Sequence, residues 1–246
     1  MQGDHARAAT CDQERWFNLT VEKTKKVWSP MVHILVVGAS RGIGREVCQA
    51  AAATGFAVCA MSRSGKMPDT VGKNCSVLKG DALVADDMAR ALEGVDIVVQ
   101  ALGVPPSLDL MTKPVTLFSE ATRILLPEMK KAGVTKLVSV TGFGAGDSRG
   151  SINVLQRLPF DILLKRAYDD KSIQEDLIEQ SDLDWLIVRP GVLMNCPASG
   201  KYRVLTTPKD WRNGIVARAD VAEFIVKRIE AGKLGREKPV IIRFPL

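Results

Sequence analysis

Short apolar runs alternate with helical segments from Met31 onward, and this alternation constrains the fold more than any other feature of the chain. Because the runs are apolar throughout, each strand is expected to be buried on both faces, which is typical of parallel sheets. Right-handed crossovers then predict a single α/β domain over 31–246, doubly wound, with helices on both faces of a mostly parallel sheet. The expected strands are 32–37, 57–61, 76–78, 96–101, 136–141, 185–188 and 240–243, and the expected helices are 42–54, 86–92, 115–132, 169–180 and 220–229.

Two residues are expected to shape individual helices. Pro127 should kink or divide the helix predicted over 115–132, because proline removes a backbone donor and its ring crowds the preceding turn. Asp220 should cap the last helix, because aspartate is a favoured residue at helix starts.

Residues 1–30 lack this periodicity and form a separate N-terminal extension with mixed charges. Two interpretations stay open: the segment is a mobile extension, or Trp16, Phe17 and Leu19 form the apolar face of a short helix that docks on the body. The extension has neither the long apolar core of a secretory signal nor the acid-poor composition of a transit peptide. We therefore expect a cytoplasmic protein.

Charge and composition exclude several classes of protein. The chain has 246 residues, 46% of them hydrophobic and 25% charged, which is an ordinary globular balance without a membrane-spanning stretch. The net charge of +6 is spread along the chain, which disfavours a nucleic-acid protein but attracts anionic small molecules. Five cysteines without a CxxC pair, and two histidines, disfavour a metal site. We expect a small-molecule substrate, no metal, no nucleic acid or membrane partner, and a monomer or homodimer.

A glycine-rich loop joins the first expected strand to the first expected helix. Gly38 permits a tight turn, Gly42 lets the backbone approach a diphosphate, and Gly44 lets the helix pack closely on the strand. Free N–H groups at the start of the helix would face the phosphates. The residues predicted to bind a cofactor here are Gly38, Ser40, Arg41, Gly42, Ile43 and Gly44.

The GxxxGxG spacing of this loop resembles the short-chain dehydrogenase/reductase superfamily. The sequence Arg189-Pro190-Gly191 is similar to a motif of its atypical, NmrA-like branch, which includes biliverdin/flavin reductase-like proteins and redox-sensing regulators. The resemblance extends from about residue 31 to 244 and implies an NAD(P)-binding Rossmann domain. It implies that Asp81 holds the adenine amino group and that 101–103 pass over the adenine-side ribose. The further cofactor-binding residues implied by the resemblance are Asp81, Ala82, Ala101, Leu102, Gly103, Lys171, Pro190 and Val192.

The end of the second expected strand favours NADP(H) over NAD(H). An acidic residue there would accept hydrogen bonds from a free ribose 2′-hydroxyl, whereas a 2′-phosphate needs a cation. The sequence has Arg63 and no acid at this point, 19 residues after Gly44. A guanidinium presents a planar fork suited to phosphate oxygens, and Arg41 offers a second one.

The resemblance implies Thr141, Tyr168 and Lys171 as catalytic residues. Members of the superfamily use a hydroxyl near the end of the fifth strand, and Thr141 stands there. They also use a tyrosine and a lysine spaced YxxxK, but here Tyr168 and Lys171 are spaced YxxK. A spacing of three residues still leaves both side chains on one helix face, although it departs from the spacing of the usual tyrosine mechanism. Lys171 and Glu175 resemble a Lys-x-x-x-Glu pattern of the atypical branch.

Three functions follow from these patterns. The first is an NADPH-dependent oxidoreductase that transfers hydride to a small conjugated carbonyl, quinone, flavin or related acceptor, which needs little acid assistance. The second is a non-catalytic NAD(P)-sensing regulatory or interaction protein, and the third is a sugar-nucleotide epimerase or dehydratase-like enzyme. The loops near 142–166 and 192–214 are expected to contact the substrate, because open α/β sheets bind ligands at these edges.

Overall fold

The computed structural model describes residues 31–66, 74–104, 114–151 and 164–245. The N-terminal extension, residues 1–30, lies outside the described residues, and so does 152–163 of the first predicted substrate loop. All the helices and strands reported below belong to the compact unit Val32–Leu246.

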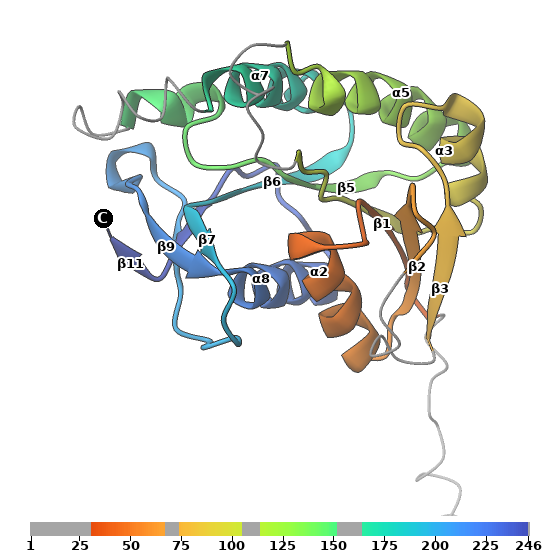
Figure 1. Ribbon diagram of the computed structural model, residues 1–246, viewed down its shortest axis with the longest axis horizontal. Coiled ribbons are helices and arrows are strands. Elements are labelled where there is room, and N and C mark those ends of the chain that lie inside the picture. Colours follow the sequence, from red (N-terminus) through yellow and green to blue (C-terminus); the bar gives the residue numbers. More distant parts are fainter. Residues whose placement is uncertain (1–30, 67–73, 105–113, 152–163, 246) are drawn as a thin grey trace, which may run out of the picture. The chain divides into compact units, whose positions relative to one another are not determined.

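The centre of this unit is an eight-stranded sheet in the order β3-β2-β1-β4-β5-β6-β10-β8 (Figure 1). Neighbouring strands pair in parallel, except that β8 runs antiparallel to β10. The doubly wound α/β fold expected from the apolar runs is therefore confirmed. The strands are β1 (His33–Val37), β2 (Ala57–Ser62), β3 (Cys75–Lys79), β4 (Ile97–Gln100), β5 (Lys136–Val140), β6 (Asp184–Pro190), β8 (Arg203–Leu205) and β10 (Val240–Ile242).

Helices cover both faces of the sheet (Figure 1). On one face lie α2 (Gly42–Ala53) and α8 (Arg218–Glu230), and on the other lie α3 (Ala85–Ala91), α5 (Leu117–Ala132) and α7 (Lys165–Glu179). Two 3-10 turns, η1 (Gly146–Ser151) and η2 (Pro208–Asp210), lie in loops. Within the described ranges, no helix has the length and apolar character needed to cross a membrane.

Strand β1 shows why the sheet is buried on both faces. Ile34 and Val36 belong to the apolar cluster under α2 and α8, whereas Leu35 and Val37 belong to the cluster under α3, α5 and α7. All four side chains are buried, because successive residues of a strand point to opposite faces. A continuous apolar run is therefore the pattern that this position in the fold requires.

Two expectations about helices need correction. Of the two effects expected of Pro127, division of the helix does not occur, since α5 runs through it from Leu117 to Ala132. Asp220 does not cap α8: Ala217 occupies the cap position, and Asp220 lies buried in the first turn. Its carboxylate instead accepts hydrogen bonds from the backbone N–H groups of Ser199 and Gly200 and from the Ser199 hydroxyl.

A second, three-stranded sheet was not expected from the sequence. It consists of β7 (Val192–Met194), β9 (Gly214–Ala217) and β11 (Phe244–Pro245), with β9 between the other two. These strands are short, and several of their residues are exposed, so they lack the long apolar runs that identify the central strands. Gly191 and Gly214 permit the close backbone approach between the two sheets, because a Cβ on Gly191 would lie 2.9 Å from the carbonyl carbon of Gly214.

The contact between α2 and β1 gives a first prediction, the effect of Gly44→Ala on stability. A Cβ at Gly44 would lie 2.9 Å from the carbonyl carbon of Gly38, and the affected atoms are backbone. Alanine is otherwise favoured over glycine within helices by about 0.5–1 kcal/mol. The steric conflict should nevertheless dominate and lower the free energy of unfolding by about 1–3 kcal/mol. Urea denaturation measures it. Gly150→Ala, where the Cβ meets nothing within 4 Å, is the control; equal effects of both substitutions would contradict this packing.

Candidate active site

A cavity of about 1290 Å³ lies at the carboxyl edge of the parallel strands. Its lining includes the segments that follow β1, β2, β3, β4, β5 and β6, the segment 195–197, Lys171 of α7 and the start of α8. Strands β1 and β4 are neighbours in the sheet, and the chain leaves them toward opposite faces (Figure 1). Such a switch point is where open α/β sheets bind ligands.

The glycine-rich loop forms one wall of this cavity. Gly38 has a φ of 93°, and a Cβ there would lie 2.7 Å from the carbonyl oxygen of Ala101 after β4. Gly42 has a φ of 61° and begins α2. The cap residue Arg41 makes no side-chain hydrogen bond to the first turn, and that turn has no acidic residue. Its amides therefore have no side-chain partner from the cap, and an anion in the cavity is the ligand that they suit.

The segment after β2 lines the cavity with Ser62, Arg63 and Ser64. Arg63 is exposed, and within the described residues no carboxylate lies within ion-pair distance of it. The positive charge of Arg63 is therefore available to an anionic ligand.

Asp81, after β3, also lines the cavity. Its Oδ1 accepts a hydrogen bond of 3.1 Å from the N–H of Leu83, and its own N–H donates to Asp87 over 2.8 Å. That N–H and the Arg90 guanidinium hold the pKa of Asp87 below its usual value. Hydrogen bonds thus hold both the backbone N–H and the carboxylate Oδ1 of Asp81. The second carboxylate oxygen, Oδ2, is available to a ligand in the cavity.

Lys171 on α7 reaches the cavity beside the end of β5. Its ammonium donates a hydrogen bond to the carbonyl oxygen of Thr141 and lies 4.9 Å from the centre of the Phe118 ring. Burial lowers the pKa of Lys171 to about 8, although the negative charges of Glu175 and Asp170 act in the opposite direction. The amine therefore changes its charge within the range in which enzymes commonly work.

Tyr168 lies close to Lys171 but does not line the cavity. The Lys171 ammonium is 5.4 Å from the centre of the Tyr168 ring, and the Tyr168 hydroxyl packs against Gly142, where a Cβ would lie 2.6 Å from it. Burial, together with the negative charge of Glu175, raises the pKa of Tyr168 to about 12. The tyrosine thus stays protonated at neutral pH and is separated from the ligand space.

Thr141 lines the cavity, but its hydroxyl proton already has an acceptor. The Thr141 Oγ1 donates to Glu175 Oε1 over 2.6 Å, within the buried interior. A hydroxyl has one proton to donate, so Thr141 can offer a ligand only its lone pairs while this bond persists.

Glu175 is the centre of a buried charge network. Both Glu175 and Arg189 have side chains that are 0% exposed, and Arg189 Nε donates to Glu175 Oε1 over 3.1 Å. The same guanidinium lies 2.6 Å from Asp147 in η1, and the Trp211 ring covers it at 5.0 Å. Gly146 has no room for a Cβ beside this pair. The network therefore joins β6, α7 and the loop after β5 behind the cavity.

Most of the predicted site residues meet at this cavity, and three do not. Gly44 packs under the loop against Gly38, Tyr168 lies behind Gly142, and the exposed Val192 lies outside the lining. The predicted residues that do line the cavity are Gly38, Ser40, Arg41, Gly42, Ile43, Arg63, Asp81, Ala82, Ala101, Leu102, Gly103, Thr141, Lys171 and Pro190.

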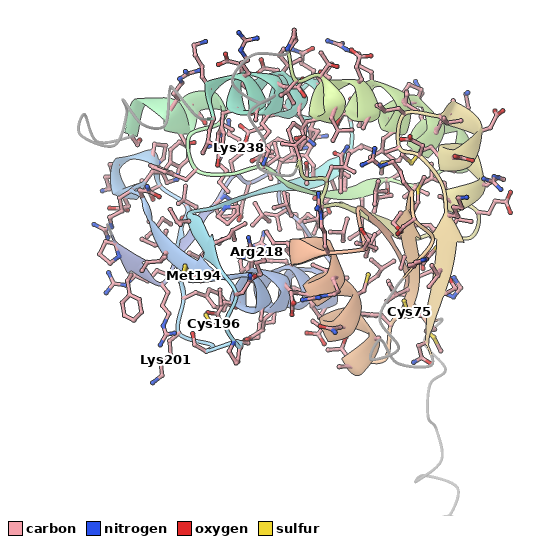
Figure 2. The ribbon with its side chains drawn as sticks, in the orientation of Figure 1. Cys75, Met194, Cys196, Lys201, Arg218 and Lys238 are labelled. Atoms are coloured by element: carbon pink, nitrogen blue, oxygen red, sulfur yellow. The ribbon has the colours of Figure 1, made fainter. Side chains whose placement is uncertain are left out.

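The loop 192–214, predicted to contact the substrate, contributes residues to this lining, whereas sequence reasoning missed Arg218. Asn195, Cys196 and Pro197 follow β7, and Arg218 begins α8 after β9. Figure 2 shows Arg218 beside the start of α2 and Cys196 at the end of β7. Because β7 and β9 are too short to be recognised as strands, the sequence held no signal that these residues approach the glycine-rich loop.

The buried network predicts a large effect of Glu175→Ala on stability. The substitution removes the main partner of a fully buried guanidinium, which should lower the free energy of unfolding by about 3–5 kcal/mol. Glu179→Ala is the matched control on the same helix, since Glu179 pairs with Lys238 near the surface and should cost about 0–1 kcal/mol. Urea denaturation distinguishes the two. Similar losses in both variants would contradict the proposed importance of burial.

Comparison with known proteins identifies the family. The sequence profile of the NAD(P)H-binding family matches residues 38–231. An uncharacterised chloroplastic protein of Arabidopsis thaliana is 30% identical over 214 residues, which are 84% of this chain and 72% of that protein. The photosystem II assembly factor Ycf39 of Synechocystis is 22% identical, and the match covers 85% of this chain and 62% of that protein.

Solved structures agree with this assignment. ChuY of Escherichia coli O157:H7, described as an anaerobilin reductase, has a TM-score of 0.71 and 25% identity over 86% of this chain and 97% of that chain. A short-chain dehydrogenase/reductase of Veillonella parvula in complex with NADP has a TM-score of 0.69 and 16% identity over 86% of this chain and 94% of that chain, and supports the fold alone. With its glycine-rich loop and its cavity at the switch point of the sheet, the chain belongs to the NAD(P)H-binding family.

Proposed function

We propose that the protein is an NADPH-dependent oxidoreductase that reduces a small conjugated carbonyl, quinone, flavin or related acceptor. The observation that carries this proposal is a single cavity lined both by the start of α2 and Arg63 and by Lys171. The dinucleotide fits this cavity, because the two glycines with positive φ leave the backbone bare where a diphosphate would approach. The reduced nicotinamide would supply the hydride, and the chain supplies binding, orientation and charge.

The preference for NADPH rests on Arg63. Its guanidinium lies after β2, where an acid would favour a free 2′-hydroxyl, and it has no carboxylate partner among the described residues. A charge-assisted, forked contact would bind a 2′-phosphate and gain nothing from a hydroxyl.

The choice of a conjugated acceptor rests on the hydroxyl groups near Lys171. Tyr168 is not part of the cavity lining, and Thr141 donates its proton to Glu175. Since neither of these two hydroxyl groups beside Lys171 is free to donate into the cavity, the site suits an acceptor that can delocalise the incoming charge better than it suits a simple ketone. Lys171 is then the group that holds positive charge beside the reacting atoms.

One observation favours a second candidate, a non-catalytic NAD(P)-sensing protein. The position of Tyr168 outside the cavity lining would suit a protein that binds a dinucleotide without oxidising or reducing it. Tight binding together with absent turnover on menadione and free flavins would favour this candidate. The cytoplasmic location stays a prediction, since the Arabidopsis relative is described as chloroplastic.

The cofactor preference predicts unequal effects of Arg63→Ala on the two nucleotides. The dissociation constant for NADPH should rise about tenfold to a hundredfold, which corresponds to the loss of a hydrogen bond to a charged group. The constant for NADH should change by less than about twofold, because no phosphate meets Arg63 in that complex. Isothermal titration calorimetry measures both. Arg123→Ala, at an exposed position of α5, is the control; equal losses for NADPH and NADH would disprove the phosphate contact.

The proposed role of Lys171 predicts both a loss of turnover and a change in the pH profile. Lys171→Met should reduce NADPH oxidation with menadione at least about tenfold, whereas Lys165→Met, on the exposed first turn of the same helix, should leave it unchanged. Since the pKa of Lys171 is about 8, its positive charge is present below pH 8 and is lost above it. The rate should therefore fall as pH rises through 8 in the wild type. If the rate of Lys171→Met still falls as pH rises through 8, the pH dependence belongs to another group and the proposed role of Lys171 is contradicted.

A further inference from the structure

Arg218 places a guanidinium directly above the start of α2. It is the first residue of α8, is half-buried and lines the cavity. Its Nε lies 4.0 Å from the position that a Cβ on Gly42 would occupy. The side chain thus approaches the glycine-rich loop from the second half of the fold, while α2 itself belongs to the first half (Figure 2).

Neutral oxygen atoms hold this guanidinium in position. Its Nη1 donates to Asn195 Oδ1 over 2.7 Å and to the carbonyl oxygen of Leu193 over 3.3 Å. Within the part of the chain that the structure describes, no carboxylate forms an ion pair with Arg218, and neither Nε nor Nη2 makes a hydrogen bond. The group therefore keeps its full positive charge and two donor atoms for a ligand.

The neighbouring segment supports the same arrangement. Asn195 follows β7, and a few residues later the N–H groups of Ser199 and Gly200 donate to Asp220 in the first turn of α8. Two sets of hydrogen bonds therefore join the segment 195–200 to the first turn of α8 and fix where Arg218 points.

We propose that Arg218 binds the diphosphate of the dinucleotide together with the α2 amides, with Asn195 as its positioning residue. This inference rests on the proposed function, because it assumes that the nucleotide occupies the cavity. The start of α2 and the Arg218 guanidinium line one cavity and meet beside Gly42, so an anion bound there would contact both. The diphosphate is common to NADH and NADPH, so Arg218 contributes affinity without choosing between them.

The test compares three probes on one set of variants by isothermal titration calorimetry. In Arg218→Gln, the dissociation constants for NADPH and NADH should both rise about tenfold to a hundredfold, by the same factor. Binding of 2′-AMP, which has the 2′-phosphate and no diphosphate, should stay within about twofold of the wild type. Arg63→Ala should give the opposite pattern, with weaker 2′-AMP and unchanged NADH. Lys201→Gln, at an exposed residue after the segment (Figure 2), is the control.

Further variants keep the proposal testable if Arg218→Gln lowers stability. Arg218→Lys keeps the charge and should lose less affinity for both dinucleotides than Arg218→Gln. Asn195→Ala keeps the guanidinium and should weaken both dinucleotides by a smaller and equal factor. Unchanged NADPH and NADH binding in Arg218→Gln would overturn the inference, and so would an equal loss for 2′-AMP. If the wild type binds neither dinucleotide, the proposed function itself fails. If the wild type and Arg218→Gln bind both dinucleotides equally well, only the inference about Arg218 fails.

Discussion

The close approach of α2 to β1 is the contact on which the rest of the site depends. Gly44 lies against the backbone of Gly38, so the helix starts immediately beyond the strand and directs its first amides over the carboxyl edge of the sheet. Gly38 in turn leaves room for Ala101 after β4. These glycines bring the two halves of the switch point together, and the cavity follows from that backbone geometry rather than from any one side chain.

The charged side chains around this cavity are of two kinds, a buried ion pair and arginines that line the cavity. Glu175 and Arg189 are paired and fully buried, and they support the loop after β5 without reaching the ligand space. Arg63 and Arg218 line the cavity and have no carboxylate partner among the described residues. The buried pair is therefore positioned to hold the structure, whereas Arg63 and Arg218 are positioned to meet an anion.

The sequence predicted the features that repeat or that demand glycine. Seven strands of the central sheet were predicted from their apolar runs, whereas the short edge strand β8 was not expected. The loop 38–44 was predictable because its glycine spacing fits a strand-to-helix turn. Asn195 lies in the loop predicted to contact the substrate, but its bond to Arg218 and the approach of Arg218 to the glycine-rich loop were not predictable, because short exposed strands carry no periodic signal. Asp220 was misassigned as a cap because a tertiary hydrogen bond to Ser199 and a capping bond require the same residue type. The position of Tyr168 outside the cavity lining likewise depends on its packing against Gly142, which cannot be predicted from the local sequence.

The most direct test of the cofactor site is a crystal structure of the protein saturated with NADPH. The diphosphate should lie within about 3 Å of the first amides of α2, with the nicotinamide toward Lys171 and the 2′-phosphate at Arg63. A nucleotide bound elsewhere on the molecule, or a cavity that holds only water at saturating NADPH, would contradict the account.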